Sequence, residues 1–149
     1  MTVLIRSLQS HPDPELRGFE IQGMQKCKVF NNKDVRDIVL QTVRPSKSRG
    51  GHYHERKTEW FLPLKGSALL SWYDIDGWNV KEKTEPMTAD MQNPKIFEIQ
   101  PKTCHFVENR SEEDFYMLAI SSEDYDSEDS LKCSKSIGPP EVTTEKDSD

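Results

Sequence analysis

Three histidines and one glutamate are the residues of this chain whose types and spacing could do chemistry. His52 and His54 stand one residue apart, and Glu59 follows five positions after the second histidine. Side chains at alternate positions of a strand point to the same face, so the two imidazoles would lie about 7 Å apart along one face. Two imidazoles placed in this way can converge on one ion or one substrate atom.

Glu59 and His105 would complete such a site. A four-residue turn separates the histidine pair from Glu59, so a hairpin would bring its carboxylate beside the imidazoles, and His105 opens a later apolar run. Three imidazoles and one carboxylate suit one divalent transition metal, such as Zn, Mn, Fe or Ni. Taken alone, the histidine pair could equally be an exposed surface feature, and it is the addition of Glu59 and His105 that favours a site.

The elements that would have to position these side chains are short β-strands. Apolar or alternating runs recur along the chain, Gly, Pro, Asn or Asp separates most of them, and no dozen residues carry a helical stripe. This pattern predicts many antiparallel strands in a sandwich or barrel. Asp76-Gly77 favours a tight hairpin, and residues 83–94 are typical of a polar loop. The expected strands are 27–31, 37–43, 59–64, 67–75, 78–84, 95–100, 105–109 and 115–120.

An acidic tail follows the last apolar run. The nine acidic and three basic residues from Ser121 onward account for the whole net charge of −6. A segment of this composition cannot bury enough apolar surface to offset the entropy cost of ordering its backbone. We therefore expect one barrel domain over residues 1–122 and an acidic tail over residues 123–149 that is mostly disordered, with its first few residues packed on the barrel.

Composition also excludes several classes of partner. The barrel part is close to neutral, whereas nucleic-acid binding needs clustered Lys and Arg. No apolar stretch approaches the roughly 18 residues of a membrane span, and the N-terminal residues do not resemble a signal peptide. The cysteines are odd in number, widely spaced and without a CxxC motif, which predicts reduced thiols in a cytoplasmic protein. They are Cys27, Cys104 and Cys133.

The segment that begins with the histidine pair resembles the first motif of the cupin superfamily. That motif reads His-x-His, three or four residues, Glu, six residues and Gly, and the glycine that usually stands six residues before the first histidine is Ser46 here. The matching residues are His52, His54, Glu59 and Gly66.

The second cupin motif is matched in part. Anchored on His105, it places Asn109 correctly, but Lys102 occupies a slot that the family fills with glycine. A non-glycine residue at positive φ costs about 1–2 kcal/mol. The resemblance as a whole covers about residues 36–122.

Within the cupins, the chain looks like the small proteins of nucleotide-sugar and surface-polysaccharide biosynthesis. These include deoxysugar ketoisomerases, epimerases and the cupin domain fused to capsule-precursor reductases. The resemblance implies an all-β, double-stranded β-helix barrel and a homodimer. In the isomerase branch such histidines transfer protons without a metal, and in the capsule-reductase cupin the same positions hold one. The full four-ligand set of this chain favours the metal-holding version.

The resemblance implies an isomerase or epimerase that acts on a keto-sugar, which we expect to be nucleotide-linked. His52 or His54 would abstract a proton beside the carbonyl, because imidazole titrates near working pH, and one divalent metal would sit on His52, His54, Glu59 and His105. Two alternatives stay open: a non-catalytic cupin that binds a sugar or stabilises a partner, and a metal-dependent dioxygenase. The residues expected to hold a substrate phosphate, with solvated surface charge as the alternative, are Arg44, Arg49 and Lys102.

Overall fold

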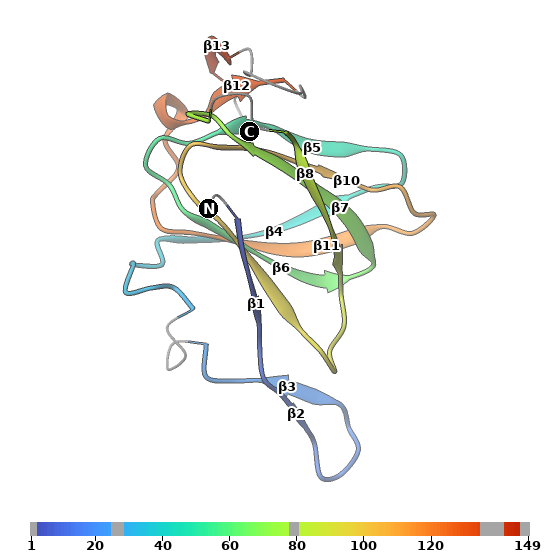
Figure 1. Cartoon of the computed structure of the whole chain (residues 1–149). Helices are drawn as coiled ribbons and strands as arrows, with labels where there is room; N and C mark the ends of the chain where they lie inside the picture. Colours follow the sequence, from blue (N-terminus) through green and yellow to red (C-terminus); the bar gives the residue numbers. More distant parts are fainter. Residues whose placement is uncertain (1–2, 25–28, 78–80, 135–141, 147–149) are drawn as a thin grey trace.

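Antiparallel strands make up nearly all of the regular structure (Figure 1). The computed structural model describes residues 3–24, 29–77, 81–134 and 142–146. Within these residues a five-stranded sheet (β1-β9-β6-β11-β4) faces a six-stranded sheet (β13-β12-β5-β10-β7-β8), and β2 pairs with β3 in a projecting hairpin. The strands are β1 (Val3–Ser7), β2 (Ser10–Pro12), β3 (Phe19–Ile21), β4 (Asp37–Val43), β5 (Ser48–Tyr53), β6 (Glu59–Lys65), β7 (Ser67–Asp74), β8 (Lys83–Thr88), β9 (Lys95–Ile99), β10 (Thr103–Glu108), β11 (Phe115–Ser121), β12 (Leu131–Cys133) and β13 (Val142–Lys146).

The predicted all-β barrel is confirmed. Strands β4, β6, β7, β9, β10 and β11 each begin and end within two residues of an expected run. The described residues contain one short 3₁₀ helix, η1 (Ser127–Asp129). None of them belongs to a helix long and apolar enough to cross a membrane.

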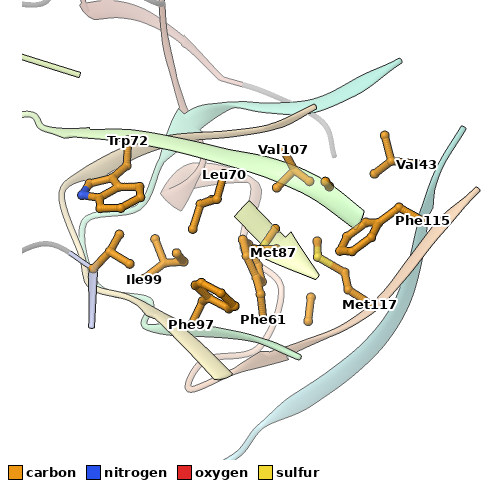
Figure 2. Packing of buried hydrophobic residues seen from close by; sticks show 13 residues of the cluster. Val43, Phe61, Leu70, Trp72, Met87, Phe97, Ile99, Val107, Phe115 and Met117 are labelled. Carbon is orange, nitrogen blue, oxygen red and sulfur yellow. The ribbon is translucent and has the colours of Figure 1, made fainter. Parts of the chain in front are cut away.

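The barrel interior and the outer face of one sheet are both apolar, which explains why β6 is a continuous hydrophobic run. Phe61 points inward and packs with Phe97, Phe115 and other buried side chains (Figure 2). Trp60, its neighbour in sequence, lies on the opposite face and meets Phe30 edge-on at 5.0 Å between ring centroids. A strand buried on both faces cannot show alternation, so it appears in the sequence as an unbroken apolar run.

One predicted loop is a strand. Residues 83–94 were expected to form a polar loop, but β8 (Lys83–Thr88) lies within them and pairs with β7. Pro86 is tolerated because β8 is the edge strand of its sheet, where a missing N–H interrupts no ladder. The turn at Asp76-Gly77 forms, with the Gly77 amide donating to the Asp74 carbonyl at 3.1 Å. Parts of the runs predicted at 27–31 and 78–84 lie outside the described residues.

The two non-glycine residues in the motif slots adopt the conformation that glycine would favour. Ser46 has φ of 65° and Lys102 has φ of 61°. The chain therefore keeps both left-handed turns at a cost of about 1–2 kcal/mol each. Asn109 of the second motif is buried, and its amide donates to the carbonyls of Val43 (2.8 Å) and Glu113 (2.7 Å).

The acidic tail is ordered further along the chain than the first few residues that were expected to pack on the barrel. Asp129, Ser130 and Cys133 are buried, and β12 pairs with β5 on the barrel. We call residues 125–133 the strap. Residues 135–141 and 147–149 lie outside the described residues.

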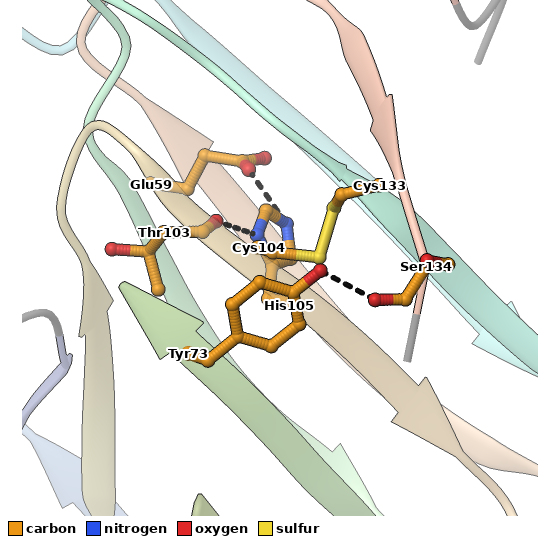
Figure 3. Close-up of a disulfide and its surroundings, with 7 residues drawn as sticks. All are labelled: Glu59, Tyr73, Thr103, Cys104, His105, Cys133 and Ser134. Atoms are coloured by element: carbon orange, nitrogen blue, oxygen red, sulfur yellow. Dashed lines mark hydrogen bonds and ion pairs between the residues drawn. A yellow bond between two sulfur atoms is a disulfide. The ribbon is translucent and has the colours of Figure 1, made fainter. Parts of the chain in front are cut away.

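The prediction of reduced thiols is wrong for two of the three cysteines. Cys104 and Cys133 form a disulfide that ties the strap to β10 (Figure 3). The bond joins positions 29 residues apart that become neighbours only when β12 adds to β5. The spacing of the cysteines in the sequence therefore does not predict this disulfide. Cysteine content therefore no longer argues for a cytoplasmic location. Cys27 lies outside the described residues.

Candidate active site

A β-bulge between β5 and β10 lies next to His52 and sets the direction of its strand. His52 lies directly opposite His105, and the register then shifts so that Phe106 faces Gly50. Gly50 has φ of 103°, and a Cβ at this position would lie 2.4 Å from the His105 carbonyl oxygen. Only glycine fits both the backbone conformation and this close approach.

The four predicted residues converge. One potential ligand atom from each of His52, His54, Glu59 and His105 lies within 4.8 Å of the others. The Nε2 atoms of His54 and His105 lie 3.2 and 3.4 Å from the same carboxylate oxygen, Oε1 of Glu59. Three of the four residues are buried, and His52 is partly exposed.

Backbone carbonyls hold the opposite nitrogens of two of these imidazoles. Nδ1 of His54 lies 2.5 Å from the carbonyl oxygen of Asp129, and Nδ1 of His105 lies 2.9 Å from that of Thr103 (Figure 3 for His105). A carbonyl can only accept, so both Nδ1 atoms carry the proton and both Nε2 atoms turn toward Glu59. Histidines that ligate metals are commonly oriented in this way.

The pKa values of two of the site residues are strongly shifted. Burial lowers the pKa of His52 to about 3, with further lowering from the neighbouring His105 and His54. Burial acts to raise the pKa of Glu59, but hydrogen bonds from His105 and His54 outweigh it and hold that pKa well below its usual range. The site therefore holds a carboxylate beside a neutral imidazole, and this set of donors fits a divalent cation.

A cavity of about 310 Å³ opens over the four residues. Its walls come from the inward faces of strands β4, β5, β6, β10 and β11 and from the strap. Apolar side chains such as Phe61 and Met117 line it together with polar groups. A small, mixed cavity with convergent polar groups is the usual form of a small-molecule site.

The three cationic side chains predicted to bind phosphate lie in different places in the structure. Arg49 lines the cavity, and its Nε donates to the Thr42 carbonyl at 2.8 Å. Arg44 lines a neighbouring groove. Lys102 lines neither and instead forms an ion pair with Asp76 at 3.3 Å, because its left-handed turn lies beside the Asp76-Gly77 turn.

The strap supplies cavity residues that sequence reasoning missed. Tyr125, Asp126 and Ser130 line the cavity, although their segment was expected to be solvated tail. Asp126 also pairs with Arg56 at 2.6 Å, which fixes the strap against the turn after the histidine pair. No local signal marks these residues as part of a cavity, because the contacts that bring the strap to the barrel, such as the Asp126–Arg56 ion pair, are with distant parts of the chain.

A family model described as the polysaccharide biosynthesis C-terminal domain matches residues 24–131. The chain belongs to this family. A relative, UDP-2-acetamido-2,6-beta-L-arabino-hexul-4-ose reductase of Pseudomonas aeruginosa, is 31% identical over 130 residues, which are 86% of this chain and 32% of the reductase. The chain thus spans about a third of the length of that relative.

Solved structures of sugar-nucleotide enzymes share the fold of the chain. The sugar 3,4-ketoisomerase QdtA of Thermoanaerobacterium thermosaccharolyticum, in complex with TDP, superposes with a TM-score of 0.68 at 20% identity, covering 87% of this chain and 86% of that chain. The RmlC epimerase of Mycobacterium tuberculosis superposes with a TM-score of 0.72 at 14% identity, covering 88% and 68%. These likenesses establish the cupin barrel.

Proposed function

We propose that the chain binds a nucleotide-linked keto-sugar in its barrel cavity and isomerises or epimerises it by moving a proton on the carbon beside the carbonyl. The convergence of three imidazoles and one carboxylate under the cavity carries this proposal. The ketoisomerase and the epimerase that share the fold support it. The reductase relative supports the substrate class, since it is named for a UDP-linked hexul-4-ose.

His52 is the base in this proposal. It is the only one of the four site residues that is partly exposed, and its low pKa keeps the imidazole neutral and able to accept a proton. The Glu59 carboxylate would stabilise the imidazolium that forms. A base with so low a pKa is weak, so the carbon acid must be activated by polarisation of its carbonyl. His54 is the second candidate for this role.

We further propose that His52, His54, Glu59 and His105 hold one divalent transition metal, Zn, Mn, Fe or Ni. The two Nε2 atoms directed at Glu59 support this assignment. When bound, the ion would supply the positive charge that polarises the substrate carbonyl. A nitrogen that binds an ion cannot also take a proton, so metal binding and proton transfer at His52 exclude each other at the same nitrogen and call for separate experiments.

The phosphates of the substrate would lie in the groove that adjoins the cavity. Arg44, Lys47 and Arg49 line this groove, which has a volume of about 500 Å³ and shares Arg49 and Gly50 with the cavity. Guanidinium groups bind phosphoryl oxygens in pairs of parallel hydrogen bonds. Lys102, which was predicted for the same task, lies outside this groove and pairs with Asp76.

A non-catalytic sugar-binding cupin is the second candidate. The observation that favours it is the match to one third of a longer reductase, in which such a segment could bind substrate for a separate catalytic domain.

Incubation with keto-deoxysugar nucleotides in heavy water separates the two candidates. An isomerase or epimerase places deuterium on the carbon beside the carbonyl, and His52→Ala abolishes this exchange, whereas His11→Ala in β2, outside the cavity, leaves it unchanged. Stabilisation by the ligand without exchange would support the binding module, and oxygen consumption would support a dioxygenase.

Elemental analysis of the purified protein tests the metal. Glu59→Gln should weaken metal binding by at least about 10–100-fold, because the loss of even an outer partner has this effect. A wild-type protein that stays metal-free in excess Zn, Mn, Fe and Ni would contradict the metal assignment and leave the proton-transfer proposal standing.

A further inference from the structure

One disulfide joins the strap to the strand that carries His105. Cys104 precedes this histidine in β10, and Cys133 is the last residue of the strap (Figure 3). Cys104 is completely buried, whereas Cys133 keeps 8% of its surface exposed. Both belong to a buried cluster with Tyr53 and Tyr73. A single covalent bond therefore fixes the end of the strap beside a residue of the site.

Apart from the disulfide and the buried Asp129, the strap is attached by short or exposed contacts. Within the described residues, its ladder with β5 covers only Leu131 and Lys132. The ion pair of the strap with the barrel joins Asp126 and Arg56, whose side chains are 40% and 58% exposed. Ion pairs between exposed groups contribute little to stability. The disulfide is therefore a principal restraint on the strap.

The strap contributes to the cavity in two ways. Three of its residues form part of the cavity wall. In addition, the buried carboxylate of Asp129 accepts hydrogen bonds from the backbone amides of Glu55 (2.7 Å) and Arg56 (3.3 Å), which lie in the turn between His54 and Glu59. When the strap opens, one part of the wall leaves the cavity and this turn loses both hydrogen bonds.

We propose that the Cys104–Cys133 disulfide is a redox-sensitive closure of the cavity, in which the oxidised form holds the strap on the barrel and reduction by a dithiol releases it. The expected effect on catalysis rests on the proposed function. The opening of the strap does not, because it is a property of the substrate-free protein.

The reaction is a thiol–disulfide exchange. A thiolate of the dithiol attacks Sγ of Cys133, the more exposed partner, and the sulfur of Cys104 leaves as the S–S bond breaks. The second thiol of the reductant then attacks the mixed disulfide and frees Cys133. In total, two electrons and two protons pass from the dithiol to the protein, so that both cysteines become thiols and the reductant becomes a disulfide.

Reduction changes how far the strap can open. With the bond intact, the strap can leave the barrel only as a loop that stays attached at Cys133. A cross-link of this kind restricts the open state and shifts the equilibrium toward the closed one, typically by about 30- to 1,000-fold. The reduced strap should therefore open more often by a factor in this range.

Amide hydrogen exchange of the full chain, followed by NMR with and without dithiothreitol, measures this opening. The amides of Glu55 and Arg56 donate to Asp129 and report the contact directly. Their protection factors should fall by about 30- to 1,000-fold on reduction and recover on reoxidation. They should still exchange well before the amides of the β6–β11 ladder, which report global unfolding. Alkylation and mass spectrometry should count two more free thiols in the reduced protein.

Cys27→Ser, which keeps both halves of the disulfide, is the matched control and should respond as the wild type does. Cys133→Ser should show the reduced behaviour under both conditions. Unchanged exchange at Glu55 and Arg56 on reduction would overturn the proposal, and so would a reduced protein in which these amides exchange together with the ladder. Free thiols at Cys104 and Cys133 that cannot be oxidised would overturn it as well.

The catalytic consequence is measured separately, by deuterium incorporation into a keto-deoxysugar nucleotide. Reduction should slow it by about 10–100-fold in the wild type and in Cys27→Ser, because small displacements of site residues have effects of this size, and it should leave Cys133→Ser unchanged. Equal incorporation in both redox states would overturn control of the cavity by the strap. No incorporation in either state would contradict the proposed function instead, while amide exchange alone decides whether the strap opens.

Discussion

The cavity has two walls that are built in different ways. The histidine wall carries His52, His54, Glu59 and His105 on or beside β5, β6 and β10, each of which pairs with neighbouring strands over several residues. The strap, by contrast, pairs with β5 at two residues of β12. Its other contacts with the barrel include the Asp126–Arg56 ion pair, the contacts of Asp129, the packing of Leu131 and one disulfide.

This difference teaches where the site is robust and where it is vulnerable. The wall is fixed by many small contributions, so that the loss of one side chain leaves the backbone in place. The strap depends on a few separate contacts, so that the loss of one of them should move several cavity residues together. Three experiments test this contrast, beginning with the largest expected effect.

Removing the disulfide should cost the most. Replacing Cys104 and Cys133 by Ser together should lower the free energy of unfolding by about 2–4 kcal/mol, because the closed loop no longer restricts the unfolded chain. For a chain of this size, that corresponds to a melting temperature lower by roughly 5–15 °C. Thermal unfolding followed by circular dichroism measures the change. A reductant should destabilise the wild type but not the double variant, and equal melting temperatures would show that the strap is not tied in this way.

Acid should lower the free energy of unfolding gradually, by about 2 kcal/mol over the 1.5 pH units between pH 6 and 4.5. The pKa of His52 is about 3 in the folded protein and about 6.5 in the unfolded chain. Between these values the unfolded chain binds a proton that the folded protein does not, so the stability of the metal-free protein falls as pH drops, by up to about 1.4 kcal/mol per pH unit. The carboxylate of Glu59, with its lowered pKa, adds stability above about pH 4.5 that is lost on further acidification.

Urea unfolding at a series of pH values tests this expectation. His52→Gln should flatten the dependence between pH 6 and 4.5, while His11→Gln in β2 should preserve it. A wild-type curve that is flat over this range would contradict the burial of a neutral imidazole at position 52.

The smallest expected effect concerns the turn between β4 and β5, which contains Ser46. Ser46→Gly should stabilise the protein by about 0.5–1 kcal/mol, because relief of the positive φ exceeds the entropy cost of glycine. Ser48→Gly, two residues further on in β5, is the matched control and should destabilise by about 0.5–1 kcal/mol. If both variants lose stability, the turn at Ser46 carries no strain.

The histidine wall was predictable because its signals are local. His52 and His54 point to one side of β5, while Tyr53 packs in a separate cluster on the other side. The same local reasoning predicted strain at Lys102, which does adopt positive φ, and Ser46, which also stands in a glycine slot of the motif, does so as well.

The strap was not predictable for the opposite reason. Its composition is that of a solvated tail, and the partners that order it are far away in sequence, as in the contact of Asp129 with His54. Strand β8 was missed through similar reasoning, because Pro86 and its charged neighbours are typical of a loop unless the strand is known to lie at an edge.

The pairing of β7 with β10 has an optical consequence. Trp72 stands directly opposite His105 in this ladder and is buried, so that the two side chains lie on one face of the sheet within about 5 Å at their β-carbons. Trp60, in contrast, packs in the cluster on the other side of β6. Of the three tryptophans, Trp72 therefore lies next to the four-residue site, Trp60 faces away from it across β6, and Trp78 lies outside the described residues. With Trp60 and Trp78 replaced by Phe, the emission of Trp72 would report directly on what enters the cavity, without any added label.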